Sequence, residues 1–87
     1  MERLDYFLND RMKTIVVLHQ HQIEVNNVKF CPMNQDEIAS EIGCSKVKTN
    51  QLLKELVDTG YVEVLKKGRY VLTDSAIKVI EKLELGE

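Results

Sequence analysis

The sequence predicts a small, mostly helical α+β domain, and three observations lead to this prediction. Apolar residues recur at helical spacing on both sides of Gly43, as in two consecutive amphipathic helices. Two short apolar segments flank Lys66-Lys67-Gly68, a pattern typical of a β-hairpin with a tight turn. The chain has 87 residues, of which 44% are hydrophobic and 30% charged, so we expect one globular domain spanning 1–87.

The first segment, 1–25, is expected to be a helix whose main apolar stripe packs on the core. Tyr6, Val16 and Val17 lie away from that stripe, which indicates a second packing partner for this helix. Asn26-Asn27 is a turn signal, and the segment 28–31 alternates as a short strand that stops at Pro32.

Segment 34–59 has the features of two helices joined by a tight turn. Asn34 is a suitable N-cap, and Glu37 can complete a capping box with it. Gly43 suits the end of the first helix, and Ser45 can cap the second. The expected buried faces are Ile38, Ala39 and Ile42 in the first helix, and Thr49, Leu52, Leu53, Leu56 and Val57 in the second. Because so few residues join the helices, they must cross steeply, which is a helix-turn-helix pattern.

Segments 61–72 and 73–85 are expected to form the hairpin and a final helix. A three-residue loop would pair Val64 with Tyr70 and Val62 with Leu72, which gives one apolar face. A two-residue loop would instead set Glu63 against Leu72, so we prefer the longer loop. Thr73 or Asp74 would cap the final helix. Its apolar stripe, which includes Val79 and Leu83, is broad enough for two neighbours.

The stretch EIASEIGCSKVKTNQLLKELVDTGYV, followed by a hairpin and YVLT, resembles the winged helix-turn-helix DNA-binding domains, particularly small bacterial regulators of the MarR and GntR kind. The resemblance covers Asn34 to Thr73. It implies that the second helix enters the major groove and that the hairpin, called the wing, meets flanking backbone or the minor groove. It also implies a homodimer formed by the terminal helices. The residues expected at that interface are Tyr6, Val16, Val17, Val79 and Leu83. The alternative is that the C-terminal helix of the same chain covers the second apolar side of the first helix.

The exposed face of the second helix is the candidate DNA-binding surface. Gln51 or Asn50 would bond adenine, Lys46 or Lys48 would reach guanine or phosphate, and Val47 would touch a thymine methyl. The full set of candidate DNA-binding residues, with backbone contacts and the wing tip included, is Ser45, Lys46, Val47, Lys48, Asn50, Gln51, Lys54, Lys66, Lys67 and Arg69. The alternative is an ordinary solvated helix face and an ordinary basic turn.

The charge distribution favours one DNA-facing side. The net charge is −2, but the segment from Lys46 to Arg69 holds six basic and three acidic residues, a balance of +3 that leaves −5 elsewhere. We therefore expect sequence-specific binding of double-stranded DNA by a homodimeric transcriptional regulator. The alternative function is a winged-helix protein-interaction module that does not bind DNA.

Other classes of function find little support in the sequence. There is no nucleophile–base constellation and no phosphate-binding glycine loop, so we do not expect an enzyme. His19 and His21 point to different sides of a helix, and Cys31 and Cys44 are interpreted as free thiols, so no metal or other cofactor is expected. Neither a signal peptide nor a membrane-spanning run is visible, so the expected location is the cytoplasm. No pattern identifies a small-molecule effector.

Overall fold

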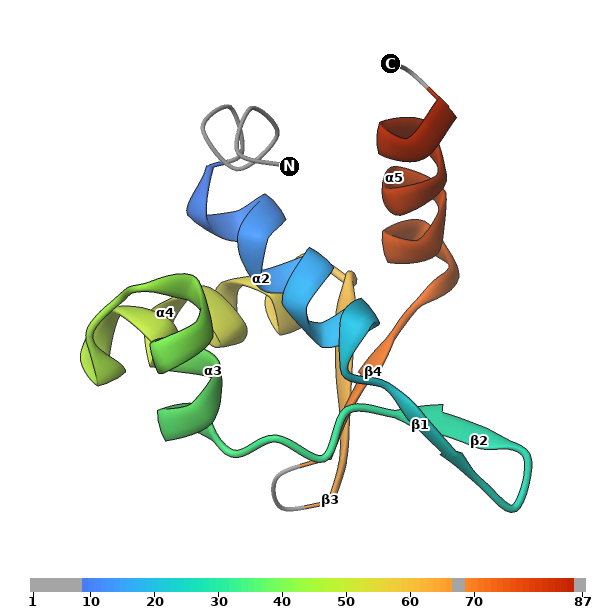
Figure 1. Ribbon diagram of the computed structural model, residues 1–87, viewed down its shortest axis with the longest axis horizontal. Helices are drawn as coiled ribbons and strands as arrows, with labels where there is room; N and C mark the ends of the chain where they lie inside the picture. Colours follow the sequence, from blue (N-terminus) through green and yellow to red (C-terminus); the bar gives the residue numbers. More distant parts are fainter. Residues whose placement is uncertain (1–8, 67–68, 86–87) are drawn as a thin grey trace.

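The computed structural model describes residues 9–66 and 69–85 (Figure 1). Its elements follow the order α2 (Asp10–Gln20), β1 (Ile23–Val25), β2 (Val28–Phe30), α3 (Gln35–Ile42), α4 (Lys46–Asp58), β3 (Val62–Lys66), β4 (Arg69–Leu72) and α5 (Asp74–Leu85). The α+β class and its mostly helical character are confirmed. The part of the first-helix prediction that concerns residues 1–8 lies outside the described residues.

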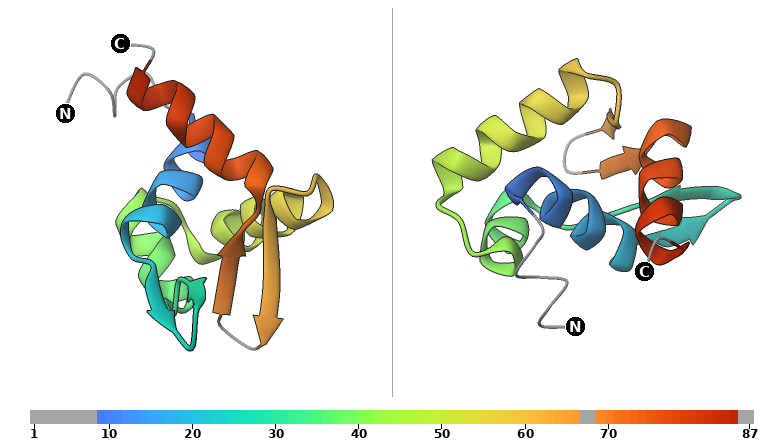
Figure 2. Two further views of the ribbon diagram at one scale, coloured as in Figure 1. Left: turned by 90° about the vertical axis from the view of Figure 1, so that its right-hand side faces the viewer. Right: turned by 90° about the horizontal axis from the view of Figure 1, so that it is seen from above.

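Helix α2 is central to the packing, because it contacts α3, α4, β4 and α5 (Figure 2). Asn9 caps its first turn, and the Asn9 side chain accepts a hydrogen bond from the Met12 N–H at 2.8 Å. The buried residues of α2 are Thr14, Ile15, Val17 and Leu18.

Within the described residues, no helix is long and apolar enough to cross a membrane.

The prediction of a helix over 1–25 is wrong at its end, since α2 stops at Gln20 and the segment 23–25 is strand β1. This strand pairs with β2 in an antiparallel hairpin that matches Val25 with Val28. Asn26 and Asn27 form the expected turn, with φ angles of 53° and 68°. Two consecutive positive φ angles suit a tight hairpin, and asparagine tolerates them better than most residues. One short strand was predicted here, and the structure has two.

Helices α3 and α4 form the predicted helix-turn-helix. Asn34 accepts a hydrogen bond from the Glu37 N–H at 2.8 Å, and the Asn34 N–H donates to Glu37 Oε1 at 2.9 Å, which completes the capping box. Gly43 ends α3 with φ 74°, in the left-handed region. Ser45 caps α4 by accepting the Lys48 N–H at 3.1 Å. Val57 was expected on the buried face, but it is 38% exposed.

The wing has the predicted register, with Val62 opposite Leu72 and Val64 opposite Tyr70. The predicted three-residue loop is wrong, because Lys66 pairs with Arg69 and only two residues lie between them in the sequence. A register shift between Val64 and Lys66 restores the predicted pairing in the rest of the hairpin. The conformation of Gly68 falls outside the described residues. Thr73 caps α5, because its Oγ1 accepts the Ala76 N–H at 3.4 Å.

Cys31 joins the first hairpin to the wing. Its N–H donates to the Tyr70 carbonyl at 2.8 Å, and the Tyr70 N–H donates back to the Cys31 carbonyl at 3.1 Å. Cys31 is completely buried, whereas Cys44 is half-buried. Burial raises the pKa of the Cys31 thiol, which keeps it protonated and unreactive.

Candidate nucleic-acid interface

Helix α4 presents the predicted polar residues on one exposed face. The exposed members of this face, including the cap, are Ser45, Lys46, Val47, Lys48, Asn50, Gln51 and Lys54. Val47 is 69% exposed, more than any other large apolar side chain in the described part of the chain. On the opposite face, Thr49, Leu52, Leu53 and Leu56 are buried. The helical period therefore separates a core face from a face that is open to a partner.

The wing adds further basic side chains. Lys66 and Arg69 are exposed and lie opposite each other at the end of the hairpin, whereas Lys67 falls outside the described residues. The Arg69 guanidinium lies 5.1 Å from the centre of the Phe30 ring, a cation–π contact that links the wing to β2. Figure 2 shows α4 and β3 on one side of the molecule, with α2 and the β1–β2 hairpin on the other.

Three predicted residues of α4 already have partners from other helices. Lys46 Nζ lies 3.5 Å from an Asp36 carboxylate oxygen, and Lys48 Nζ lies 3.7 Å from one of Asp10. Asn50 Oδ1 accepts a hydrogen bond of 3.3 Å from Gln35 Nε2, which also lies 3.4 Å from the Tyr70 hydroxyl. Asp10, Asp36 and Gln35 could not be identified from the sequence, because no local pattern marks a contact between separate helices.

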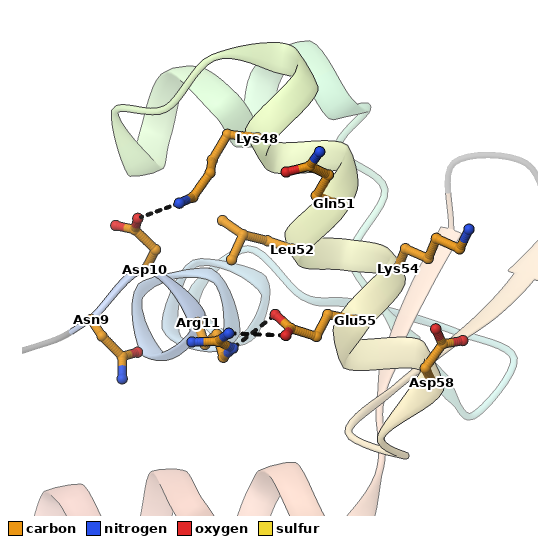
Figure 3. A pocket seen from close by; sticks show the side chains of 9 residues that line it. All are labelled: Asn9, Asp10, Arg11, Lys48, Gln51, Leu52, Lys54, Glu55 and Asp58. Carbon is orange, nitrogen blue, oxygen red and sulfur yellow. Dashed lines mark hydrogen bonds and ion pairs between the residues drawn. The ribbon is translucent and has the colours of Figure 1, made fainter.

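A shallow polar hollow of about 500 Å³ lies between the start of α2 and the face of α4 (Figure 3). Its lining residues are Asn9, Asp10, Arg11, Lys48, Gln51, Leu52, Lys54, Glu55 and Asp58. Across it, Arg11 makes a two-pronged ion pair with Glu55, with distances of 2.8 and 2.9 Å. This hydrogen bonding lowers the pKa of the Glu55 carboxyl and raises the pKa of Arg11. The pair links the first turn of α2 to the last part of α4.

The residues expected at a dimer interface differ in their exposure. Val16, Val79 and Leu83 are half-buried, so each has surface left for another partner. Val17 was expected to lie away from the core, but it is only 8% exposed and belongs to the core cluster. Tyr6 lies outside the described residues. Across 9–66 and 69–85, no cluster of His, Cys, Asp and Glu could hold a metal ion.

The fold and the exposed α4 face define a winged helix-turn-helix domain, and comparisons with solved structures bear out this fold. The CO-sensing protein from R. rubrum, in its reduced Fe(II) form, aligns with a TM-score of 0.73 at 19% identity, over 83% of this chain and 34% of that one. A CRP-family transcriptional regulator from Thermus thermophilus aligns with a TM-score of 0.71 at 15% identity, over 99% and 45% of the two chains. A CRP/FNR-family regulator from the same organism gives a TM-score of 0.63 at 21% identity, over 83% and 39%.

The present chain thus spans less than half the length of each of these proteins. Residues 31–74 match the family described as a domain of unknown function, DUF7343, and they make up just over half of the chain. The protein belongs to this family. A comparison with curated protein sequences gave no match. Two of these three proteins are described as CRP/FNR-family and CRP-family transcriptional regulators. The narrower resemblance to MarR and GntR regulators stays a prediction.

Proposed function

We propose that this protein binds double-stranded DNA in a sequence-specific way and acts as a transcriptional regulator. The observation that carries the proposal is the exposed face of α4, where Val47 and polar side chains lie among lysines beside a basic wing. Helix α4 has 13 residues and is therefore about 20 Å long. A helix of this size fits the major groove of B-DNA, where side chains distinguish all four base pairs.

The proposed contacts divide into two kinds. Val47, Asn50 and Gln51 carry apolar or amide groups that read base edges, and Lys46 or Lys48 at the start of the helix reaches guanine or phosphate. Ser45 and Lys54, with the wing residues Lys66, Lys67 and Arg69, contact the backbone and set the register.

A homodimer forms part of the proposal, because one chain presents only +3 in the segment from Lys46 to Arg69. Two copies double that charge and place two α4 helices on half-sites about 34 Å apart. The half-buried Val16, Val79 and Leu83, together with Tyr6, are the residues we propose for the dimer contact.

A second candidate function is protein binding, and the first hairpin favours it. Ile23, Val25 and Val28 are 46%, 47% and 43% exposed, which is a small apolar patch away from α4. A winged-helix interaction module would use such a patch and would not depend on the lysines of α4.

The test begins with selection of bound duplexes from a random DNA pool, combined with measurement of the mass of the complex. We expect one recurring motif with two half-sites and a complex of two chains per duplex. Binding should weaken by orders of magnitude over a few-fold rise in salt, because about 6 or more phosphate contacts release counterions.

A triple variant, Lys46→Ala, Lys48→Ala and Gln51→Ala, then separates the two candidate functions. DNA binding should fall about tenfold or more, because the base contact of Gln51 is lost. The carboxylates of Asp36 and Asp10, which face Lys46 and Lys48, are also left beside the DNA backbone. The matched control replaces Gln20, Lys29 and Lys78, which are exposed and lie away from α4, and it changes the net charge equally. Equal binding by both triple variants, or no motif from the pool, would refute the DNA-binding proposal.

A further inference from the structure

Two lysines in the first turn of α4 face carboxylates from two other helices. Lys46 Nζ lies 3.5 Å from Asp36 of α3, and Lys48 Nζ lies 3.7 Å from Asp10 of α2 (Figure 3 shows the second pair). All four side chains are well exposed, between 42% and 70%. The two carboxylates therefore occupy positions beside the lysines that a DNA phosphate would also approach.

We propose that Asp10 and Asp36 act as internal competitors of DNA phosphate for Lys48 and Lys46. This inference rests on the DNA binding proposed above and adds a mechanism that limits the affinity for DNA. In the free protein each lysine is paired with its carboxylate. To bind phosphate, the lysine leaves the carboxylate, which then stands exposed and negative beside the DNA backbone.

The consequence for binding follows from the balance of ions. When a lysine with no partner meets a phosphate, it displaces a condensed counterion from the DNA, and this release drives binding. When the lysine first leaves an aspartate, that aspartate attracts a cation in its place. The net release of ions for that contact is then close to zero, so the contact adds little affinity and little salt dependence.

The same two carboxylates also have a structural role, which the experiment has to distinguish from their competition with DNA phosphate. Asp10 and Asp36 lie in the first turns of α2 and α3, where a negative charge also interacts favourably with the helix dipole. Asp74 provides a matched control, since it is exposed in the first turn of α5. No salt bridge to Asp74 is present within 9–66 and 69–85.

Each lysine that is freed from its carboxylate should change both the salt dependence and the affinity of DNA binding. One additional phosphate contact steepens the slope of log K against log salt by about 0.9. Relative to 1 M salt, this corresponds to roughly fivefold tighter binding at about 0.15 M and roughly 15-fold at about 0.05 M. Neutralising both carboxylates should steepen the slope by about 1.8 for each bound chain.

The experiment compares wild type with Asp10→Asn, Asp36→Asn, the double variant and Asp74→Asn. Affinity is measured by fluorescence anisotropy at several salt concentrations, on the selected duplex and on a duplex of scrambled sequence. We expect tighter binding and steeper slopes on both duplexes for the first three variants, and wild-type behaviour for Asp74→Asn. Thermal unfolding of all variants checks that the fold is retained.

A double-mutant cycle gives an independent measurement. Lys48→Gln should weaken binding more strongly in the Asp10→Asn background than in wild type, because only there is the lysine free to gain from phosphate. If wild type binds DNA but the aspartate variants keep its slope, the competition is refuted and the proposed DNA binding stands. If wild type does not bind either duplex at low salt, the proposed function fails and this inference fails with it.

Discussion

Two threonines are completely buried, and they differ in how their hydroxyl groups are satisfied. Thr14 Oγ1 donates a hydrogen bond of 2.8 Å to the Asp10 carbonyl. Thr49 Oγ1, beneath the proposed DNA-binding face of α4, has no hydrogen-bond partner in the described part of the chain. Replacing each threonine by valine exchanges a hydroxyl for a methyl of similar size, so the pair isolates the effect of the hydrogen bond.

The two substitutions are expected to change the free energy of unfolding by clearly different amounts. A buried polar group without a partner costs about 1–3 kcal/mol, so Thr49→Val should raise the free energy of unfolding by about that amount. Thr14→Val loses a hydrogen bond worth about 1 kcal/mol and gains about 0.8 kcal/mol from burial of a methyl, so its effect should be near zero. Threonine and valine have similar helix propensities, which removes that difference from the comparison.

Urea unfolding followed by circular dichroism measures both variants against wild type. For a domain of this size, 1 kcal/mol corresponds to a shift of about 4–8 °C in Tm, so thermal unfolding gives a second reading. A Thr49→Val variant that is no more stable than wild type, or no more stable than Thr14→Val, would contradict the expected cost of the unpaired Thr49 hydroxyl.

Three further predictions concern the elements that hold α4 in place. Gly43→Ala should lower the free energy of unfolding by about 1 kcal/mol in denaturant titrations, because an alanine is strained at a φ of 74°. A steric clash does not contribute, since no atom lies within 4 Å of an added Cβ. An unchanged free energy of unfolding would contradict this. Asn34→Ala removes the capping box and should cost about 1 kcal/mol by the same measurement, whereas equal stability would mean that the cap is not needed. The hydrogen bond from Arg11 lowers the pKa of the Glu55 carboxyl below its ordinary value of 4.5. The ion pair therefore stabilises the folded state above pH 4.5, and this stabilisation is lost as the pH falls through the lowered pKa of Glu55. A double-mutant cycle for unfolding should find coupling between Arg11 and Glu55 at about pH 7 and none at about pH 2, and coupling that persists in acid would count against this.

Several features of the fold could be predicted because their causes lie within a few residues of each other. The cap at Asn34, the left-handed Gly43 and the cap at Ser45 are local interactions, and all three are present. The pairing of Val62 with Leu72 also follows from a local rule, because the period of two leaves one register that keeps both on the core side. The register shift between Val64 and Lys66, which gives a two-residue separation at the turn, was not predicted. The exposed face of α4 follows in turn from its buried face.

Other features depend on contacts between distant segments. The apolar alternation of the segment 23–25 suits either the end of a helix or a strand, and pairing with β2 decides for the strand. Val17 lies in the core because α2 contacts several elements. The buried stripe of α2 is therefore wider than that of a helix that packs on a single partner. Val57 is 38% exposed although Leu53 and Leu56 on the same helix are buried, so helical spacing alone did not give the width of the core face of α4.

The order of the helices, the turn at Gly43 and the residues that α4 exposes could all be derived from the sequence. The packing of the helices places Asp10 and Asp36 beside Lys48 and Lys46, and it pairs Arg11 with Glu55 44 positions away. Helical period and capping act over one or two turns, whereas ion pairs between helices depend on how those helices cross. The charges that surround the proposed DNA-binding face are therefore a property of the packed fold.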